Sequence, residues 1–410
     1  MEMSLQSLSK VLRWAALAAG SAALVACGGG GSDAGSPVAA AGSLRVALTD
    51  APRCRVGNDD LAQVNVTVER VRVHPSMDDD PASSRWVDIP IIPAKKINLL
   101  DLTNGRLEEL GTTPLAAGTY SQVRLVLSPN GGGTPANSVV LAGQTVEIPL
   151  RTPSAAQSGL KIVRPFTVAP NALVDLVIDF DACRSIVALG NGGFLLKPVL
   201  SAHLRAVAAI AGYVDPAVAD VMVSAQKGGR VVRSTIPAAD GAFTLAFLDP
   251  AEAPYDVVLT APARGTSVVA GVPVATNAIT TLSTLAVPTP LPTAAATPSR
   301  SASGTLAPAA ARDTGVVRAL QAVGSVAAVE VATTNVNGTT GAYVLTLPTA
   351  APLLASFSTT LPLSFASPAS PPADFSYRLE ASAVGYVTQT QNIGAGSANA
   401  TWDPTLVLAP

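Results

Sequence analysis

Apolar and polar residues alternate over short stretches from Ser43 onward. Between residues 43 and 49, Leu44, Val46 and Leu48 occupy every second position. Successive side chains of a strand point to opposite faces, so this alternation predicts a half-buried strand. Comparable strand patterns recur at residues 64–73, 86–89, 123–127, 145–150, 173–181 and 193–205.

Turn-forming residues separate these stretches, as in Asn130-Gly131-Gly132-Gly133. Short strands with frequent turns are typical of a two-sheet sandwich. We therefore predict an all-β fold that begins with an antiparallel β-sandwich over residues 43–205. One helical turn is predicted inside it, at Leu107-Glu108-Glu109-Leu110.

The apolar period slips by one residue inside the second predicted strand. Valines at the even positions 64 to 68 are followed by valines at the odd positions 71 and 73. A one-residue slip within a strand indicates a β-bulge, which we place near Glu69-Arg70.

The rest of the chain repeats a shorter strand pattern twice. Gly241-Ala242-Phe243-Thr244-Leu245 corresponds to Gly341-Ala342-Tyr343-Val344-Leu345, a shared glycine–x–aromatic–x–leucine step. The repeat predicts two smaller Ig-like β-sandwich modules, at residues 208–287 and 303–410. Between them, residues 288–302 are rich in Pro, Ala, Ser and Thr, which is the composition of a semi-rigid linker.

The N-terminus has the pattern of an export signal. Lys10 and Arg13 accompany an almost purely apolar run that continues to Ala26. This run is long enough for a signal-peptide core and too short to span a membrane. It ends in Leu24-Val25-Ala26-Cys27, which resembles the lipobox of bacterial lipoproteins.

The lipobox resemblance implies a removable signal peptide over residues 1–26 and a lipid, including palmitate, on Cys27. Residues 27–42, which begin with a glycine run, then form a leash between the lipid and the folded chain. Gly28, rather than an aspartate, follows Cys27, and in such lipoproteins this implies the outer membrane. The expected location is the bacterial cell envelope, with the membrane as a partner through the lipid.

Charge and cysteine content narrow the function. The formal net charge is −2 and no basic stripe occurs, so we expect no nucleic-acid partner. Of the three cysteines, Cys54 and Cys183 remain once Cys27 carries a lipid. In an oxidising compartment a disulfide between them is the simplest assignment. A reactive thiol or a metal ligand is the alternative, without a Cys-x-x-Cys spacing or a nearby histidine to support it.

Three carboxylates fall on one face of the strand predicted at residues 173–181. Asp175, Asp179 and Asp181 lie opposite the apolar row of that strand. Together with Asp50 they would suit a hard cation such as calcium. The alternative is a solvated sheet face on which the carboxylates pair with basic side chains of neighbouring strands. The basic candidates are Arg45, Arg124 and Lys197. Because no EF-hand spacing occurs, we assign no firm metal site.

Other patterns for chemistry are weaker. Met77-Asp78-Asp79-Asp80-Pro81 is a second calcium candidate and is also typical of a surface turn. His74 and His203, the two histidines, have no ligand-spaced neighbours. Asp101 with Glu108 or Glu109 would form a carboxylate pair for glycoside hydrolysis, without a motif to support it. No nucleophile elbow, zinc-protease motif or phosphate loop occurs, so we predict neither an enzyme nor a cofactor.

Aromatic side chains are candidates for a sugar-stacking platform if they are exposed, although core packing is the usual role of aromatics in strands. The candidates are Trp86, Tyr120, Tyr213, Tyr255, Tyr343, Tyr377, Tyr386 and Trp402.

Several short motifs occur in a fixed order across residues 43–205. They are Leu48-Thr49-Asp50-Ala51-Pro52, Val66-Thr67-Val68-Glu69-Arg70-Val71, Leu99-Leu100-Asp101-Leu102, Ala117-Gly118-Thr119-Tyr120, Ser158-Gly159-Leu160-Lys161, Asp179-Phe180-Asp181-Ala182 and Leu196-Lys197-Pro198-Val199. In these motifs the segment resembles domain of unknown function 4382, a family of bacterial lipoproteins without a characterised activity. The two C-terminal repeats look like carboxypeptidase regulatory-like modules, which have a prealbumin-like, carbohydrate-binding-like fold.

Together these observations predict a lipid-anchored envelope lipoprotein that acts as a non-catalytic binding or scaffolding module. Its expected partner is a polysaccharide, peptidoglycan or another envelope protein. An envelope hydrolase or metal-dependent enzyme with a loop-built site is one alternative, and a purely structural spacer is the other.

Overall fold

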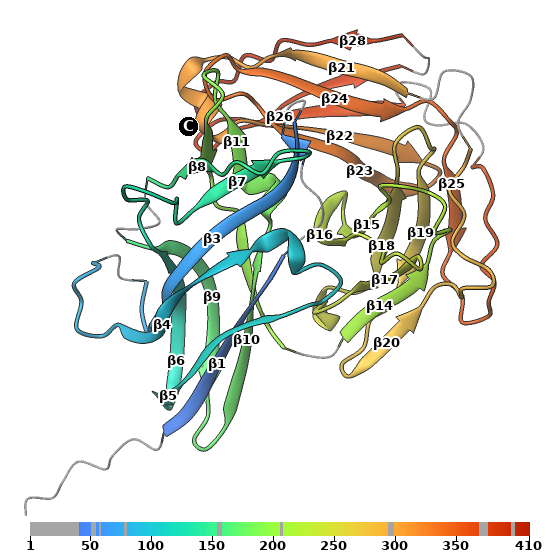
Figure 1. Ribbon diagram of the computed structural model, residues 1–410. Helices are drawn as coiled ribbons and strands as arrows, with labels where there is room; N and C mark the ends of the chain where they lie inside the picture. The colour runs from blue at the N-terminus through green and yellow to red at the C-terminus, as the bar shows by residue number, and fades with distance from the viewer. Residues whose placement is uncertain are drawn as a thin grey trace, which may run out of the picture. The chain divides into compact units, whose positions relative to one another are not determined.

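The computed structural model describes residues 41–50, 55–56, 59–77, 80–153, 158–205, 208–293, 299–368, 376–394 and 398–410. Their regular secondary structure is almost entirely β-strand, so the all-β prediction is confirmed (Figure 1). Residues 40–410 cluster into one unit. The predicted signal peptide, Cys27 and nearly all of the leash lie outside the described residues. Among the described residues, no helix has the length and apolar character needed to cross a membrane.

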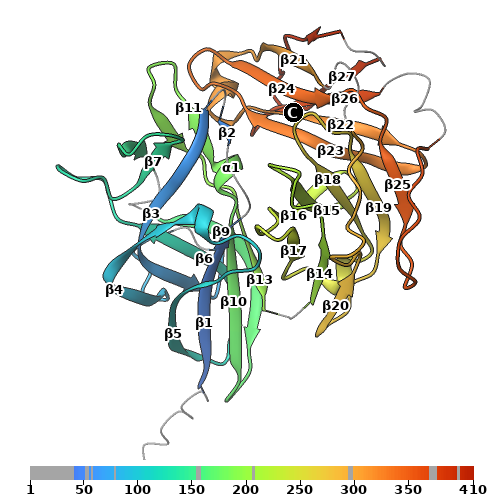
Figure 2. The same ribbon diagram turned by 45° about the vertical axis from the view of Figure 1, so that its right-hand side comes forward.

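Residues 41–204, here called the N-terminal sandwich, form two sheets (Figures 1 and 2). The first sheet has the order β13-β10-β1-β5. Its strands are β1 (Ala41–Asp50), β5 (Glu108–Ala116), β10 (Leu173–Phe180) and β13 (Leu200–Leu204). Leu44, Val46 and Leu48 of β1 are fully buried, as their alternation predicted. The pairing is not wholly antiparallel, because β1 and β10 run parallel.

The second sheet has the order β11-β12-β8-β7-β3-β6-β9, and β2 and β4 pair with β3. Its strands are β2 (Arg55–Val56), β3 (Asp59–His74), β4 (Val87–Asn98), β6 (Gly118–Leu127), β7 (Ser138–Leu141), β8 (Ile148–Arg151), β9 (Leu160–Val168), β11 (Ile186–Ala188) and β12 (Phe194–Leu196). Among the described residues one four-residue α-helix occurs, α1 (Ala182–Ser185), which follows β10 and leads into β11.

The sequence located the bulge but not the helical turn. The register of β3 shifts between Val68 and Arg70 against both β4 and β6, which confirms the predicted bulge. The helical turn predicted at residues 107–110 is wrong, because β5 begins at Glu108 and pairs with β1. Its alternating burial places Leu110 in the core, and this burial outweighs the local helical pattern. A single 3-10 turn, η1 (Leu99–Asp101), lies nearby instead.

The middle module begins at residue 208 and has sheets of order β17-β14-β20 and β16-β15-β18-β19-β25. Its elements are β14 (Ala208–Tyr213), β15 (Met222–Lys227), β16 (Arg230–Thr235), β17 (Ala242–Leu245), η2 (Pro250–Glu252), β18 (Tyr255–Thr260), β19 (Ser267–Val272) and β20 (Ala278–Thr281).

The last strand of the middle module comes from a distant part of the chain. β25 (Leu353–Ser356) pairs in parallel with β19, and both views place the two strands side by side (Figures 1 and 2). Ala355 and Leu363 are buried in the core of the middle module. We call residues 353–366 the strap. The strap lies inside the predicted range 303–410, yet it completes a sheet of the module predicted at 208–287. The predicted ranges therefore do not include this contribution of a strand from one range to the other module.

The C-terminal module has sheets of order β24-β21-β28 and β23-β22-β26-β27. Its elements are β21 (Ser299–Thr305), η3 (Ala309–Thr314), β22 (Val316–Val323), β23 (Val326–Asn335), β24 (Ala342–Pro348), β26 (Tyr377–Ser382), β27 (Gln389–Ile393) and β28 (Ala400–Thr401). β21 begins at Ser299, inside the predicted linker 288–302.

The repeated sequence step has the same structural role in both modules. Phe243 in β17 and Tyr343 in β24 are buried. The preceding glycines, Gly241 and Gly341, have φ of +83° and +77°. A Cβ there would lie 2.1 Å from the carbonyl oxygen of Val214 and 2.5 Å from that of Leu306, respectively. Glycine is therefore required at both turns, and the aromatic ring that follows fills each core.

Candidate functional site

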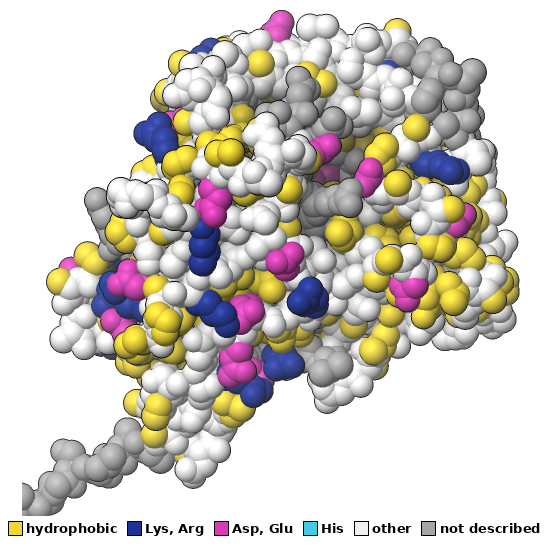
Figure 3. All heavy atoms as spheres, in the orientation of Figure 1, with side chains coloured by type: hydrophobic (Ala, Val, Ile, Leu, Met, Phe, Trp, Pro, Cys, Tyr) yellow, Lys and Arg dark blue, Asp and Glu magenta, His cyan; other side chains and the backbone are white. Residues whose placement is uncertain are grey.

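The predicted aspartate face contains an ion pair at its solvent side. Arg45 lies opposite Asp175 in the β1–β10 register, and its Nε donates to Asp175 Oδ1 at 2.8 Å. Arg205 Nη1 lies 3.8 Å from the second carboxylate oxygen. The hydrogen bond from Arg45 lowers the pKa of Asp175, because it favours the charged carboxylate. Charges of both signs are likewise interspersed over this part of the surface (Figure 3).

Asp179 is buried and faces the middle module. Its carboxylate lies 2.5 Å from Arg233 Nη1 of β16, and both side chains are nearly inaccessible. Burial raises the pKa of Asp179 in spite of the attraction to Arg233. His203 is close by and shares a 2.8 Å hydrogen bond between its Nε2 and Ser201 Oγ. Burial, with the charges of Arg233 and Arg164, lowers the pKa of His203 to about 3.

Asp181 has a third role, as the N-cap of α1. Its Oδ1 accepts from the backbone N–H of Arg184 at 3.0 Å. The Oγ of Ser185 donates to the backbone carbonyl of Asp181 at 2.6 Å. Burial raises the pKa of Asp181 to about 6, and the nearby Asp179 and Glu330 carboxylates add to this effect. The side chain therefore orders the turn between β10 and β11.

The three aspartates thus have different roles. Asp175 forms an ion pair near the surface, Asp179 forms a buried ion pair across a module boundary, and Asp181 caps a helix. Among the described residues, no group of three His, Cys, Asp or Glu side chains could hold a metal ion. The structure therefore favours the ion-pair interpretation of this face, and the predicted pairing of Asp175 with Arg45 is observed. The Asp50 side chain lies outside what the structure describes, and so do Asp78 and Asp79 of the second calcium candidate. Asp80 Oδ1 accepts from Ala82 N–H at 2.9 Å, as in an ordinary turn.

The cysteine prediction is covered only in part. Cys183 in α1 is disulfide-bonded, and its partner is not among the described residues. Cys54 lies outside them as well, so the pairing of Cys54 with Cys183 stays a prediction.

Most of the aromatic candidates pack inside the modules. Trp86, Tyr120, Tyr255, Tyr343 and Tyr377 are buried, whereas Tyr213, Tyr386 and Trp402 are partly exposed. The guanidinium carbons of Arg72 and Arg124 lie 4.9 and 4.6 Å from the centroid of the Trp86 ring. His74 contacts the same ring at a centroid distance of 4.7 Å. For most of these rings, core packing rather than sugar stacking is the role that the structure supports.

The carboxylates suggested for glycoside hydrolysis belong to separate elements. Asp101 lies in η1, whereas Glu108 begins β5 and forms a salt bridge with Lys95. This salt bridge is partly exposed and joins β4 to β5, which belong to different sheets of the N-terminal sandwich.

Asn104 connects the N-terminal sandwich to the middle module. Its backbone N–H donates to Thr235 Oγ1 at 3.0 Å, and this hydroxyl donates back to Asn104 Oδ1 at 2.9 Å. The backbone N–H of Thr244 donates to the same Oδ1 at 3.2 Å. Arg233–Asp179 is the buried ion pair of this boundary.

Asn335 connects the N-terminal sandwich to the C-terminal module. Its Nδ2 donates to the backbone carbonyls of Arg184 at 2.8 Å and Ile186 at 2.9 Å. Lys197 Nζ donates to the carbonyl of Thr314 at 2.7 Å. Burial and the positive charge of Arg184 lower the pKa of Lys197 to about 8. The backbone N–H of Gly338 donates to the carbonyl of Ala188 at 3.1 Å.

Gln226 connects the middle and C-terminal modules. Its amide donates to the carbonyl of Glu330 at 2.7 Å and accepts from the N–H of Glu330 at 2.8 Å. Arg318 Nη1 donates to Gly229 O at 2.9 Å and to Glu330 Oε2 at 3.1 Å. An apolar cluster lies in the same boundary. Its members are Val258, Val268, Val323 and Val329, with Val331 and Leu354 packed against them.

The three boundaries meet around a cavity of about 470 Å³, here called the junction cavity. Arg184 and Ile186 line it from the N-terminal sandwich, Ser224 and Thr260 from the middle module, and Asn335 from the C-terminal module. The remaining lining residues are Cys183, Met222, Val231, Val316, Glu330, Val331, Ala332, Thr333, Thr334, Val344, Leu345 and Thr346.

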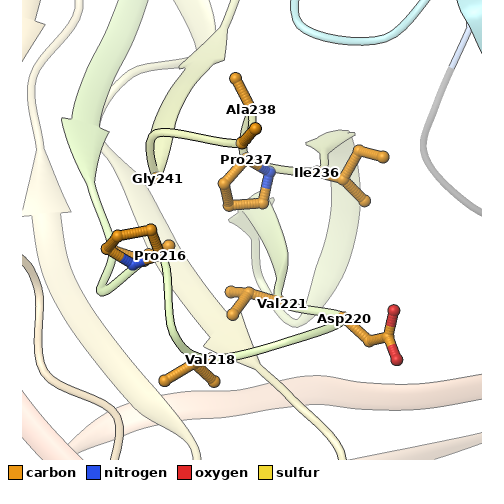
Figure 4. A pocket seen from close by; sticks show the side chains of 10 residues that line it. Pro216, Val218, Asp220, Val221, Ile236, Pro237, Ala238 and Gly241 are labelled. Atoms are coloured by element: carbon orange, nitrogen blue, oxygen red, sulfur yellow. The ribbon is translucent and has the colours of Figure 1, made fainter.

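A second, smaller pocket of about 110 Å³ lies within the middle module (Figure 4). Its labelled side chains are apolar apart from Asp220, including Pro216, Val218 and Ile236. With apolar walls and little volume, it is less suited to a polar ligand than the junction cavity.

Sequence reasoning did not identify the residues that join the modules. Arg233, Gln226 and Asn335 lie in the observed strands β16, β15 and β23, but no sequence motif surrounds them. One signal was present, because Asp179 lies in a run of apolar residues that is buried on both faces. A carboxylate in such a strand needs a buried cationic partner, although the sequence does not say which residue supplies it.

Residues 41–198 match the profile of a family described as a domain of unknown function (DUF4382). No protein with a curated description matches the chain. Structural alignments pair it with the Bacillus anthracis TIE protein at 11% identity, 90% coverage of this chain, 51% of that chain and a TM-score of 0.17. The Corynebacterium diphtheriae major pilin SpaA aligns at 10% identity, 88% and 99% coverage and a TM-score of 0.16.

The chain spans about half the length of the Bacillus anthracis protein. At these TM-scores neither alignment informs the fold or the function of this chain. The regulatory-like resemblance of the two smaller modules stays a prediction. The DUF4382 match covers the N-terminal sandwich up to residue 198, which includes α1 and both of its capping residues.

Proposed function

We propose that the protein is a lipid-anchored, non-catalytic component of a bacterial cell envelope that binds or scaffolds other envelope material. The observation that carries the proposal is the direct bonding of all three modules to one another. Asn104, Asn335 and Gln226 each bridge a different pair of modules. Modules joined in this way present their loops in a fixed arrangement, as a scaffold requires.

The roles of the ionisable side chains support a binding rather than a catalytic role. Asp179 is paired with Arg233, and Glu330 with Arg318. Asp181 is engaged as a helix cap. Each of these buried groups therefore has a structural partner: the Asp179–Arg233 pair joins two modules, whereas the Glu330–Arg318 pair and the Asp181 cap each lie within one module.

The proposed anchor is a lipid on Cys27, carried through the leash at residues 27–42. The location proposed with it is the outer membrane, because Gly28 follows the lipidated cysteine. The partners proposed are a polysaccharide, peptidoglycan or another envelope protein.

The anchor is tested by expressing the full chain and its Cys27→Ser variant with labelled palmitate. We expect label and membrane fractionation for the natural chain, and loss of both in the variant. An unlabelled natural chain in the cytosol would contradict the proposal.

The binding role is tested with the full chain in detergent, incubated with isolated peptidoglycan and with purified envelope polysaccharides. Cosedimentation that survives 0.5 M salt, about three times physiological ionic strength, would support specific binding. Recovery of the protein only in the soluble fraction with every envelope preparation would contradict it.

A further inference from the structure

The junction cavity has the size and position of a small-ligand site. Its volume of about 470 Å³ lies within the range of roughly 300–1,000 Å³ that is usual for such sites. Ligand sites occur preferentially where domains meet, and here all three modules contribute walls. Asn335 fixes one wall, because its amide holds the backbone carbonyls of Arg184 and Ile186.

Arg184 differs from the other arginines near the module boundaries. Arg233 and Arg318 form ion pairs with Asp179 and Glu330. Among the residues that the structure describes, the Arg184 guanidinium has no ion-pair or hydrogen-bond partner, although its backbone is bonded at both N–H and carbonyl. A half-buried guanidinium that lines a cavity without a partner is suited to bind a carboxylate through two parallel hydrogen bonds.

The local charge favours an anion at this position. The positive charge of Arg184 contributes to the lowered pKa of Lys197, so the two cations lie close enough to interact. Glu330 also lines the cavity, but Arg318 lies 3.1 Å from its carboxylate and offsets that charge. Asp181 is a further acidic neighbour, and the charge of Arg184 lowers its pKa against the larger effect of burial, while its Oδ1 accepts the backbone N–H of Arg184 in the α1 cap.

The other walls offer hydroxyl groups and apolar carbon. Thr333 Oγ1 is buried and has no hydrogen-bond partner among the described residues. Ser224, Thr260 and Thr346 add hydroxyls, and valines supply the apolar surface between them. A buried hydroxyl without a partner costs about 1–3 kcal/mol. A rotation of the half-buried Thr333 side chain that turns Oγ1 from its present buried position toward the cavity would let a hydroxylated ligand recover that cost.

We propose that the junction cavity binds an acidic sugar unit, with its carboxylate on Arg184 and a ring hydroxyl on Thr333. The valines would contact the carbon face of the sugar ring. This proposal rests on the proposed binding function and narrows its partner to a polysaccharide that contains uronic acid.

The test measures binding of glucuronate and galacturonate to the purified full chain in detergent, by calorimetry. Glucose and galactose are the matched neutral probes. We expect at least tenfold tighter binding of one uronate than of its neutral counterpart. Arg184→Gln should weaken uronate binding at least tenfold, and Thr333→Val about fivefold.

Arg151→Gln is the control variant, since Arg151 is exposed in β8 and does not line the cavity. Its affinity should equal that of the natural chain. Melting curves establish that each variant is folded, and Thr333→Val provides the test if Arg184→Gln does not fold. Equal affinity for uronate and neutral sugar, no binding at 10 mM uronate, or unchanged binding in both cavity variants would overturn the assignment.

Failure here is distinguishable from failure of the proposed function. A chain that sediments with peptidoglycan but ignores uronates loses only the cavity assignment. Cytosolic, unlabelled protein would remove the envelope function whatever the sugar measurements give.

Discussion

The boundary between the N-terminal sandwich and the middle module differs in chemistry from the boundary between the two smaller modules. The first is polar and contains the buried pair Asp179–Arg233. The second contains an apolar valine cluster and is strengthened by the strap, which completes the neighbouring sheet. Burial of apolar surface stabilises without regard to pH, whereas a buried ion pair depends on the protonation and integrity of both partners.

Because of this difference in chemistry, the two boundaries should separate under different conditions. The middle and C-terminal modules share a strand and core residues, so they should unfold together. The N-terminal sandwich has its own complete core and should separate when its polar contacts are lost.

The largest effect is expected from a charge placed in the strap. Ala355→Asp puts a carboxylate into the core of the middle module, where Ala355 is 2% exposed. We expect a loss of about 3 kcal/mol or more in the free energy of unfolding. Chemical denaturation provides the measurement, with Ser356→Asp as control because the neighbouring Ser356 is exposed. Equal stability of the two variants would show that the strap is not part of the core.

The buried ion pair should give the next largest effect. Arg233→Met leaves Asp179 buried without its cation, which should cost about 3 kcal/mol. Adding Asp179→Asn should recover much of that loss, because the charge itself is removed. Arg230→Met on the same strand is exposed and should change stability by less than about 0.5 kcal/mol. If Arg233→Met behaves like Arg230→Met in urea unfolding, the pair does not hold the boundary.

The pH dependence of stability should reveal two opposing groups. The pKa of His203 is lowered to about 3, so its contribution is lost as pH falls from about 6.5 toward 3. The pKa of Asp181 is raised to about 6, so its contribution is present at low pH and lost as pH rises from about 4 through 6. In the natural chain these two changes largely cancel between pH 6.5 and 5.

Replacing either group should make the effect of the other on the pH dependence of stability measurable. Between pH 6.5 and 5, His203→Gln should gain about 1 kcal/mol of stability and Asp181→Asn should lose about 1.5 kcal/mol, each relative to its own value at pH 6.5. Unfolding curves at several pH values provide the measurement. If the free energy of unfolding changed with pH in the same way in both variants, His203 and Asp181 would not have opposing effects.

The smallest effect is expected from the amide bridge between the smaller modules. Gln226→Ala removes two hydrogen bonds to the backbone of Glu330 and should cost about 1–2 kcal/mol. Gln226→Glu keeps the acceptor but loses the donor, so its cost should be at least as large. If Gln226→Ala left the stability in thermal unfolding unchanged, water would fully replace the two hydrogen bonds of the bridge.

Strands and turns were predictable because their signals are local. The alternation in β1, the bulge in β3 and the glycine–x–aromatic–x–leucine step each follow from side-chain periodicity or a required φ. The turn predicted at residues 107–110 failed because the burial of Leu110 decided the structure there. Contacts between modules depend on which strands of different modules come together. The residues around Gln226 or Arg233 in the sequence do not indicate those partner strands.

The candidate site shows the same limit. Asp175, Asp179 and Asp181 were recognised as a group. The alternation of side chains alone could not show that one forms a surface ion pair, one a buried ion pair at a module boundary and one a helix cap. Arg184 stood unnoticed because its significance comes from the absence of a partner among the described residues around it, which only the folded chain reveals.

Amide hydrogen exchange can show whether the three modules are bonded directly to one another. Backbone N–H groups donate across each boundary, among them Thr244 to Asn104, Gly338 to Ala188 and Glu330 to Gln226. We predict that all three amides exchange slowly in the full chain, and that Gln226→Ala increases the exchange rate of the Glu330 amide. Exchange of the three at the rate of an unprotected peptide, while strand amides within each module stay protected, would contradict the account.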